Sequence, residues 1–563
     1  MHRSSYLVLL PTVAALFCAQ NTAQAAEPAK TETPEQFEAR LAPWRAARFG
    51  MFIHWGPVSL KGTEIGWSRG SQVPIEEYDN LYKKFNPVKF NADAWVSVAK
   101  AAGMKYVVLT TKHHDGFCLW DTKQTDHNIM NTPFHRDVTK ELAVACRKQG
   151  LAFGTYYSTC DWRHPDFPLT SPGGSVKRAT SNLDRYTDYL KAQTTELVKN
   201  YGPLFTLWFD VPQEFNAVRG QGVIDLLRTL QPNLVINNRT GAAGDYDTPE
   251  QTIGGFQMNR PWETCMTICD QWAWKPNDNM KSLQQCVSTL LSTIGGDGNL
   301  LFNVGPSPDG EIEGRQVERL KEMGAWATKH GASIYGTRGG PYKPGDWGVA
   351  TRSDKRITLF VMNWPSDGHL ILPALPAKII SATTVSGAAV KVENGPEHLA
   401  VIAPPEAARD AIATAIILTI DTPAMSLAPL TVNKMAGGRL AMASATASNT
   451  FESKAEYGAD KAIDGDAGTR WATDSGLKEV WLAVDLGVEQ LVAKAQVDEG
   501  SWDRVRRYEI QVKVGDQWKS VIAGKKIDTK PIPFPAPVKG REFRLMILEA
   551  SESPTIHEFA LYR

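Results

Sequence analysis

The sequence predicts an α/β fold in which a (β/α)8 barrel of the TIM type is followed by two β-sandwich domains. The 563 residues exceed the length of one ordinary domain, so several domains are expected. Between residues 49 and 340, short apolar runs alternate with amphipathic stretches, which indicates repeated βα units around a parallel sheet. Beyond residue 340 the helical period is lost, and short β-type runs are separated by turns that contain proline or glycine.

Eight strands are expected in the barrel, which we assign to residues 34–340. Eight βα units are the number that closes a barrel of this type. Helical patterns separate most of the strands, over residues 92–102, 139–148, 183–199, 223–230, 282–292 and 315–329. The strands are expected to start near Phe49, Lys105, Leu151, Leu204, Leu234, Trp262, Asn299 and Ser333.

Two β domains are expected after the barrel. Residues 341–425 contain β-type runs such as 357–362 and 415–420 and are assigned to a small β-sandwich. Residues 421–434 hold two prolines and few charges, which is typical of a linker. Residues 435–563 are assigned to a second β-sandwich.

Residues 1–25 have the pattern of an export signal peptide. His2 and Arg3 precede an apolar run over residues 6–19, and Ala-Gln-Ala follows at 23–25. Lipid attachment at Cys18 is the alternative, but the residues before it are a poor approach to a lipidated cysteine. No later segment offers ~18 uninterrupted apolar residues, so no membrane span is predicted. We therefore expect a periplasmic or extracellular protein.

The charge balance disfavours nucleic acid and anionic membranes as partners. Lys plus Arg and Asp plus Glu number 61 each, and the pI is near 7.2. A neutral ligand is expected, and the 17 Trp include enough indole faces to contact one. The six cysteines after the signal show no metal-binding spacing and are expected to be buried free thiols. The oligomeric state is left open.

Polar side chains end several of the predicted strands, where a parallel barrel gathers its active site. Asp210 ends the apolar run 204–209, and a carboxylate there is costly to bury unless it is paired or used. Glycoside hydrolysis requires two carboxyl groups that face one bond. We pair Asp210 with Glu263, which opens the sixth strand, while an ion-pair or helix-start role for Glu263 remains the alternative.

Five motifs occur in order within residues 44–340: FIHWG at 52–56, KHHDGF at 112–117, WFD at 208–210, WETC at 262–265 and NLLFNVGP at 299–306. Together they resemble glycoside hydrolase family 29. The resemblance implies an exo-acting, retaining α-L-fucosidase that releases terminal α-L-fucose from fucosylated oligosaccharides or glycoconjugates by double displacement. It implies no cofactor for catalysis.

The resemblance also implies residue roles. Asp210 is the nucleophile and Glu263 the acid/base. Imidazole and guanidinium groups can bond sugar hydroxyls, and aromatic faces suit the apolar face of fucose. The positions that match the fucose pocket are His54, His113, His114, Tyr156, Trp208 and Arg239.

Two departures from the family pattern concern the pocket entrance. Relatives often have Glu-Trp where this chain has Gly66-Trp67, so Trp67 and the nearest carboxylate, Glu64, are added to the expected pocket. Many relatives have glycine after the nucleophile, whereas Val211 follows Asp210 here.

The last domain resembles the discoidin or coagulation-factor C-type module, through the motifs at 461–471 and 481–487. Such modules often bind carbohydrate. Oxygen ligands on a glycine-containing turn suit a structural Ca²⁺, and an ordinary Asp-Gly turn is the alternative. The expected calcium ligands are Asp464, Asp466, Thr469 and Glu558.

Two other classes of function are weighed against a glycosidase. One is a non-catalytic glycan-binding protein, which the intact carboxylate pair disfavours. The other is a metal-dependent hydrolase, which no His-x-His pair supports. Its ligands would be drawn from His54, His113, His114, Asp115 and Asp210.

Overall fold

The computed structural model describes residues 32–562, apart from 172–176, 366–367, 397, 433–438, 441, 467 and 529. The expected signal peptide therefore lies outside the described residues. Contacts within the chain divide it into a short N-terminal unit that ends at Ala39 and a unit, Arg40–Arg563, that contains all the candidate sites.

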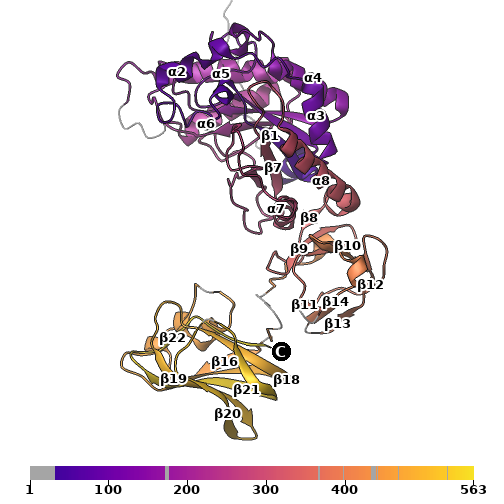
Figure 1. Ribbon diagram of the computed structural model, residues 1–563, viewed down its shortest axis with the longest axis vertical. Coiled ribbons are helices and arrows are strands. Elements are labelled where there is room, and N and C mark those ends of the chain that lie inside the picture. Colours follow the sequence, from indigo (N-terminus) through magenta and orange to yellow (C-terminus); the bar gives the residue numbers. More distant parts are fainter. Residues whose placement is uncertain are drawn as a thin grey trace, which may run out of the picture. The chain divides into compact units, whose positions relative to one another are not determined.

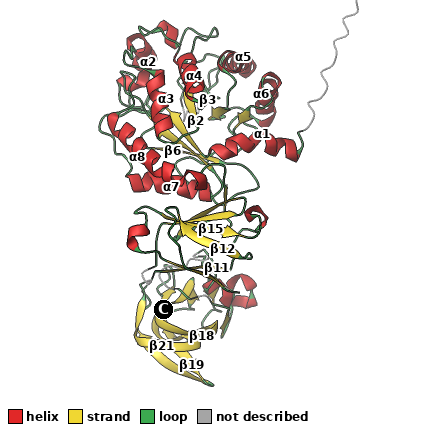
Figure 2. Cartoon of the chain, turned by 90° about the vertical axis from the view of Figure 1, so that its right-hand side faces the viewer, coloured by secondary structure: helices red, strands yellow, loops and turns green. Residues whose placement is uncertain are grey.

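A curled parallel sheet forms the centre of the first region (Figures 1 and 2). Its seven strands run in the order β5-β4-β3-β2-β1-β7-β6. All described residues of β1, β2, β4, β5 and β7 are buried, as in a sheet covered on both faces. The strands are β1 (Phe49–Ile53), β2 (Tyr106–Lys112), β3 (Ala152–Ser158), β4 (Thr206–Asp210), β5 (Val235–Ile236), β6 (Glu263–Thr267) and β7 (Asn299–Val304).

Helices flank this sheet, and six of them match the predicted helices. Five of the six begin at a side chain that accepts a hydrogen bond from the first turn: Asn91, Asp137, Asn182, Asn216 and Ser282. Two further helices, α1 (Pro34–Ala47) and α2 (Ile75–Asn80), were not predicted. The six are α3 (Ala92–Ala101), α4 (Val138–Gln149), α5 (Leu183–Tyr201), α6 (Ala217–Leu230), α7 (Leu283–Gly295) and α8 (Gly314–His330).

The eighth predicted strand, near Ser333, is wrong. A 3-10 helix covers Gly331–Ser333, because the backbone N–H groups of Ile334 and Tyr335 both turn back to the carbonyl of Gly331. The next strand, β8 (Arg338–Gly339), pairs with β9 (Gly348–Ser353) instead of the parallel sheet.

Residues 246–250 lie between β5 and β6. They make isolated parallel bridges that join Asn237 to Tyr246, Asp247 to Trp262, and Glu250 to Cys265. The segment reads Tyr-Asp-Thr-Pro-Glu, which has no apolar run, so periodicity gave no sign of it.

Two antiparallel sheets follow. A five-stranded sheet has the order β12-β15-β10-β9-β8, and a three-stranded sheet has the order β11-β14-β13. Ile357, Leu359, Ile416 and Leu418 are fully buried in the core of this region. Its strands after β9 are β10 (Arg356–Val361), β11 (His369–Pro373), β12 (Ile379–Thr384), β13 (Val392–Asn394), β14 (His398–Ile402) and β15 (Thr414–Ile420).

The last region is also built of β-strands, with Trp471 fully buried in its core. A larger sheet has the order β16-β18-β21-β19-β20, with β23 paired to β18, and β17 pairs with β22. The strands are β16 (Ser444–Ala447), β17 (Trp471–Ala472), β18 (Val480–Asp498), β19 (Val505–Val514), β20 (Gln517–Gly524), β21 (Ile532–Ala550), β22 (Thr555–Ile556) and β23 (Glu558–Tyr562).

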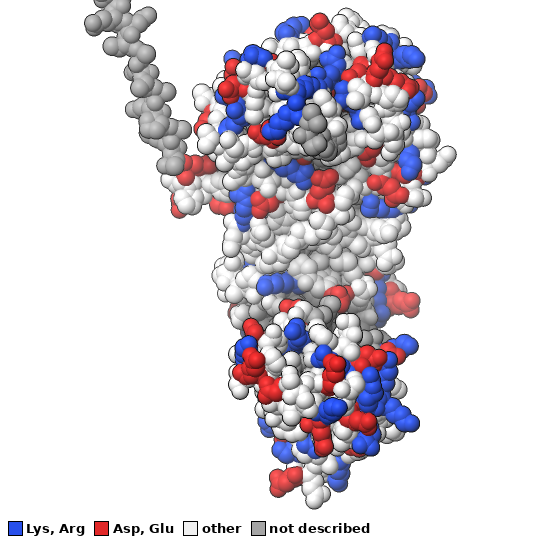
Figure 3. All heavy atoms as spheres, turned by 90° about the vertical axis from the view of Figure 1, so that its left-hand side faces the viewer, with Lys and Arg blue, Asp and Glu red and all other residues white. Residues whose placement is uncertain are grey.

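The mixed surface charge and the free cysteines agree with what the sequence predicts. On the face shown in Figure 3, acidic and basic residues are interspersed. No helix in the described part is long and apolar enough to cross a bilayer. The six predicted free thiols are all buried and unpaired: Cys118, Cys146, Cys160, Cys265, Cys269 and Cys286.

Candidate active site

The carboxyl ends of β1 to β5 bring most of the predicted pocket residues together. Asp210 is the last residue of β4, and Tyr156 lies beside it on β3. The rings of His113 and His114, which follow β2, are centred 3.8 Å apart, and His113 stacks on Tyr156 at 5.4 Å. His54 follows β1, with its ring 5.7 Å from that of His113.

The Asp210 carboxylate is held by three donors. The Tyr156 hydroxyl donates to Oδ2 at 2.8 Å. The Val211 backbone N–H donates to Oδ1 at 2.8 Å, and the Arg239 guanidinium donates to the same oxygen at 2.7 Å. Asp210 is 9% exposed, so one edge of the carboxylate can meet a ligand. Three fixed donors give this carboxylate a defined orientation at the strand end.

Arg239 joins Asp210 to a second carboxylate that the sequence analysis missed. Its Nη1 lies 2.7 Å from Asp210 Oδ1 and 2.8 Å from Glu250 Oε2, so these two oxygens are at most 5.5 Å apart. Thr248 holds the guanidinium from the other side through its hydroxyl and its carbonyl. The Glu250 side chain is 42% exposed, whereas that of Asp210 is 13% exposed.

Charge and burial have opposite effects on Arg239. Burial alone would lower its pKa, but the adjoining Asp210 carboxylate raises it above the ordinary value. The guanidinium also lies over the Trp208 ring, 4.9 Å from the ring centre. Arg239 therefore stays charged and fixed between the two carboxylates.

Glu263 lies elsewhere in the parallel sheet. It is the first residue of β6, at the amino end of the strand, and its side chain is fully buried. The Tyr106 hydroxyl and the Trp208 indole N–H both donate to its carboxylate. Burial raises the pKa of Glu263 to about 7, although these hydrogen bonds lower it. The structure therefore does not give Glu263 the open position beside Asp210 that the sequence analysis expected.

The three histidines are neutral. Burial lowers the pKa of His54 to about 4 and holds the pKa of His113 and of His114 well below 6.5. His54 Nδ1 lies 2.7 Å from Asn303 Oδ1, and His114 Nδ1 lies 2.7 Å from the Ser158 hydroxyl. Among the described residues, His113 Nδ1 and His114 Nε2 have no hydrogen-bond partner. Both nitrogens are buried, and each keeps an unused hydrogen-bonding position.

Trp67 and Glu64 have different roles. Trp67 is 43% exposed, and its ring meets that of His114 edge-on at 5.3 Å, so it borders the pocket. Glu64 accepts hydrogen bonds from the backbone N–H groups of Trp272 and Ala273, so it anchors the loop after β6.

Trp272 was not singled out in the sequence. Its ring is centred 4.8 Å from that of His54, which places an indole face beside the pocket. The signal that could have found it is its place after β6, within the stretch Asp-Gln-Trp-Ala-Trp.

One cluster resembles a metal site. Ligand atoms of His113, His114 and Asp210 lie within 4.8 Å of one another. However, the Asp210 oxygens already accept bonds from Tyr156 and the Arg239 cation, and a guanidinium at 2.7 Å opposes a metal cation. Asp115, another ligand of the metal-hydrolase alternative, accepts a bond from the Tyr78 hydroxyl instead. The donor set does not fit a metal centre.

Three of the predicted calcium ligands, Asp464, Asp466 and Thr469, lie in one turn region, and the fourth, Glu558, opens β23 beside it. Both Asp464 carboxylate oxygens lie 2.9 Å from the Thr469 hydroxyl. The Gly465 N–H donates to Glu558 at 2.7 Å, and Asp466 accepts a bond from the Gly468 N–H. Arg439 pairs with the second oxygen of Glu558 at 2.6 Å.

Paired carboxylates, neutral imidazoles and indole faces at one edge of a parallel sheet suit an enzyme that acts on a hydroxyl-rich, neutral ligand. The alpha-L-fucosidase family model matches residues 16–332, and the F5/8 type C domain model matches residues 444–559. Human plasma alpha-L-fucosidase is 32% identical over 395 residues, which cover 63% of this chain and 83% of the human protein.

Solved structures agree. Alpha-L-fucosidase isoenzyme 1 from Paenibacillus thiaminolyticus is 34% identical, with a TM-score of 0.64 over 69% of this chain and 100% of that chain. A GH29 alpha-L-fucosidase from Bacteroides thetaiotaomicron, trapped as a covalent intermediate, is 26% identical, with a TM-score of 0.63 over 68% of this chain and 96% of that chain.

The family model covers more than half of the chain, so the chain belongs to the alpha-L-fucosidase family. It is a glycoside hydrolase that releases fucose and carries a discoidin-like domain at its C-terminal end. Both resemblances noted in the sequence are confirmed.

Gly66 permits the close packing of His113. Its φ is +67°, and a Cβ there would lie 2.7 Å from His113 Nδ1. We expect Gly66→Ala to displace the imidazole and to raise KM for a chromogenic α-L-fucoside by about tenfold. This change corresponds to the loss of one hydrogen bond to the sugar. The matched control is Gly70→Ala, which has similar backbone strain but whose Cβ would meet Ile75 at 3.1 Å. Equal KM values for the two variants would contradict this role.

Glu263 makes the stability of the catalytic region depend on pH. Its pKa is raised from 4.5 to about 7 in the folded state. The stability that its proton gives the folded state is therefore fully present below pH 4.5 and is lost as the pH rises through 7. Glu263→Gln removes this titration. Between pH 4.5 and pH 8, we expect the melting temperature of the wild type to fall on the order of 5 °C further than that of the variant. Differential scanning calorimetry measures this difference, and parallel curves would refute it.

Proposed function

We propose that the protein is an exo-acting, retaining α-L-fucosidase in which Asp210 is the nucleophile and Glu250, instead of Glu263, is the acid/base. The observation that carries the proposal is the shared guanidinium of Arg239, which limits the distance between Asp210 Oδ1 and Glu250 Oε2 to 5.5 Å. Retaining glycosidases hold their carboxyl groups about 5 to 5.5 Å apart. The exposure of Glu250 also suits a group that must reach the leaving oxygen and, later, water.

The cycle has two displacements. Asp210 attacks the anomeric carbon while Glu250 gives its proton to the departing glycosidic oxygen, and a fucosyl ester forms on Asp210. Glu250 then takes a proton from water, which attacks the same carbon and frees Asp210. Two inversions release fucose with retained configuration.

Arg239 contacts both carboxylates, and its contact with Glu250 is the one that remains once Asp210 becomes a neutral ester. Glu250 serves as the acid of the first step and as the base of the second.

The pocket suits a neutral deoxy sugar. His54, His113 and His114 are neutral imidazoles, which can bond hydroxyl groups, and Trp67 presents an indole face. These features support fucosylated oligosaccharides or glycoconjugates as the substrates. Export by the signal peptide of residues 1–25 would bring the enzyme to such glycans outside the cytoplasm.

We further propose that residues 246–250 close the parallel sheet into a (β/α)8 barrel, because their bridges reach both β5 and β6. The closing strand carries Glu250 to the site. The catalytic domain would span 34–340, with β-sandwiches over 341–425 and 435–563.

A calcium ion is proposed for the turn that contains Asp464. The Thr469 hydroxyl contacts Asp464, and Glu558 accepts a bond from the adjoining Gly465 N–H, so oxygen ligands that suit a hard cation lie near this turn. When bound, the ion would fasten this turn to the strand that contains Glu558. It would have no part in catalysis.

Azide separates the two catalytic roles. For Glu250→Ala, we expect kcat on fucosides with poor leaving groups to fall about 10²- to 10⁴-fold, because general acid catalysis is lost. With a good leaving group, the second step limits turnover of this variant, so azide should restore turnover and yield fucosyl azide of retained configuration. Asp210→Ala should be inactive, and azide should yield the inverted product. Product configuration is read by NMR.

Glu263→Gln is the control for this experiment. We expect this variant to keep its turnover without azide, since its carboxylate lies in the barrel interior. Azide rescue of Glu263→Gln together with full activity of Glu250→Ala would restore the assignment made from sequence.

Chelation tests the calcium proposal. EDTA should lower the melting temperature of the C-terminal domain, and Ca²⁺ should restore it better than the smaller Mg²⁺. Asp464→Asn should abolish this response, whereas Asp460→Asn, at an exposed neighbour, should keep it. Turnover of a small fucoside should survive chelation, and its loss would favour a metal-dependent hydrolase.

A further inference from the structure

A pocket of about 560 Å³ opens among loops of the C-terminal β domain. Its walls are formed by two 3-10 helices, Phe451–Ser453 and Ala455–Tyr457, and by three loops. The loops join β17 to β18, β18 to β19, and β21 to β22. We call it the loop pocket. None of its lining residues belongs to the fucose site, so it requires a separate explanation.

The loop pocket carries unbalanced positive charge. Arg470, Lys478 and Arg504 line it, together with a single carboxylate, Glu552. Arg504 pairs with Glu552 at 3.2 Å. Within the described residues, neither Arg470 nor Lys478 has an ion-pair partner. Because the chain as a whole has a formal net charge of zero, this local excess is a property of the pocket and favours an anion.

Aromatic rings hold two of these cations in place. The Arg504 guanidinium lies 4.2 Å from the centre of the Trp502 ring, and the Arg470 guanidinium lies 5.0 Å from that of Tyr457. Trp502 is 43% exposed, so one of its surfaces is available to a ligand. Such contacts pre-organise the guanidinium groups and leave an indole on which a sugar ring can stack.

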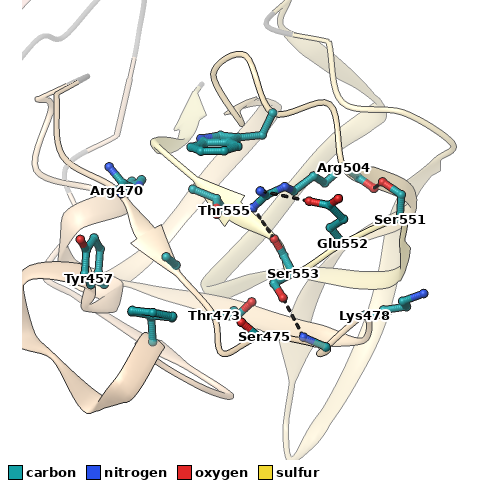
Figure 4. A pocket seen from close by; sticks show the side chains of 14 residues that line it. Tyr457, Arg470, Thr473, Ser475, Lys478, Arg504, Ser551, Glu552, Ser553 and Thr555 are labelled. Carbon is teal, nitrogen blue, oxygen red and sulfur yellow. Dashed lines mark hydrogen bonds and ion pairs between the residues drawn. The ribbon is translucent and has the colours of Figure 1, made fainter.

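Hydroxyl groups occupy the space between the cations. In Figure 4, Arg470 and Lys478 lie at opposite sides of the pocket, with Thr473, Ser475 and Ser553 between them. Ser553 accepts a hydrogen bond from the Gly476 N–H, which joins the two loops across the pocket floor. Short hydroxyl side chains can bond to sugar hydroxyls or to anionic oxygens.

We propose that the loop pocket binds an anionic saccharide, a short run of sugar units with sulfate esters or carboxylates, whose ring stacks on Trp502 and whose charged groups meet Arg470 on one side of the pocket and Lys478 on the other. A neutral sugar would leave these two cations unmatched, and a bare anion would leave the indole unused. A lipid bilayer fits less well, since Trp502 is the only large apolar side chain among the described lining residues that is classed as exposed.

The location suggests how this site assists the enzyme. A saccharide site outside the fucose pocket would keep the chain on a polymer and raise the local concentration of its fucosyl ends. The inference does not depend on the identity of the acid/base, because turnover of a small fucoside and polymer binding are measured separately.

Binding of the full-length protein to polysaccharides tests the proposal. Affinity electrophoresis is run with a sulfated fucan, the same fucan after desulfation, and polygalacturonate. We expect retention by at least one of the two anionic polymers, and at least about tenfold weaker binding of the desulfated fucan. The two anionic polymers distinguish a sulfate ester from a carboxylate as the recognised group.

Variants locate the binding. Arg470→Gln/Lys478→Gln should weaken binding at least about tenfold, because two charge-assisted hydrogen bonds are lost, and Trp502→Ala should weaken it about fivefold. The matched control, Arg507→Gln/Lys525→Gln, removes the same charge from exposed positions of the same domain outside the pocket and should bind like the wild type. All variants should turn over a small fucoside normally, which shows that they are folded.

Four outcomes would overturn the proposal. Equal binding of the desulfated fucan would indicate a neutral-sugar site. Equal loss in the control variant would indicate diffuse electrostatic attraction. Binding to phosphatidylserine vesicles without retention by any polysaccharide would indicate a membrane surface. Absence of all binding would leave the pocket without the proposed ligand.

Discussion

The charge-assisted hydrogen bonds of one guanidinium to two carboxylates organise the active site. Arg239 bonds to Asp210 at the end of β4 and to Glu250 on the segment between β5 and β6. Two carboxylates this close would repel each other, and the cation between them makes the arrangement stable. Thr248 accepts two hydrogen bonds from the guanidinium, at its hydroxyl and at its carbonyl, and so fixes the position of the cation. The fixed cation in turn sets the separation of the two carboxylates.

A second polar group, the carboxyl group of Glu263, supports the site through a set of packed aromatic rings. Glu263 is buried inside the catalytic region, where it accepts hydrogen bonds from Tyr106 and from the indole of Trp208. That indole packs against Arg239 and stacks at 5.6 Å on Tyr156, which bonds to Asp210. A buried carboxyl group whose pKa is raised to about 7 thus anchors a set of packed rings that ends at Asp210.

Much of this arrangement could be predicted from sequence, and the exceptions have physical causes. Asp210 was found because a carboxylate that ends an apolar run is conspicuous, and six helices were found from their period. Glu250 was missed because its segment is polar and pairs only through isolated bridges, so its approach to Asp210 depends on the course of the chain between β5 and β6. Glu263 was paired with Asp210 because its motif matched the family, although it opens its strand and a parallel sheet of this kind gathers its site at the carboxyl ends.

The central claim is that Glu250 is the base that activates water to hydrolyse the fucosyl ester formed on Asp210. The most direct measurement is intact-mass analysis and peptide mapping of Glu250→Gln and Glu263→Gln after incubation with 2-fluoro-fucosyl fluoride. Loss of the base slows hydrolysis of the ester, so the account predicts a persistent fucosyl adduct on Asp210 in Glu250→Gln and rapid loss of the adduct in Glu263→Gln. An adduct on another residue, or persistence only in Glu263→Gln, would contradict it.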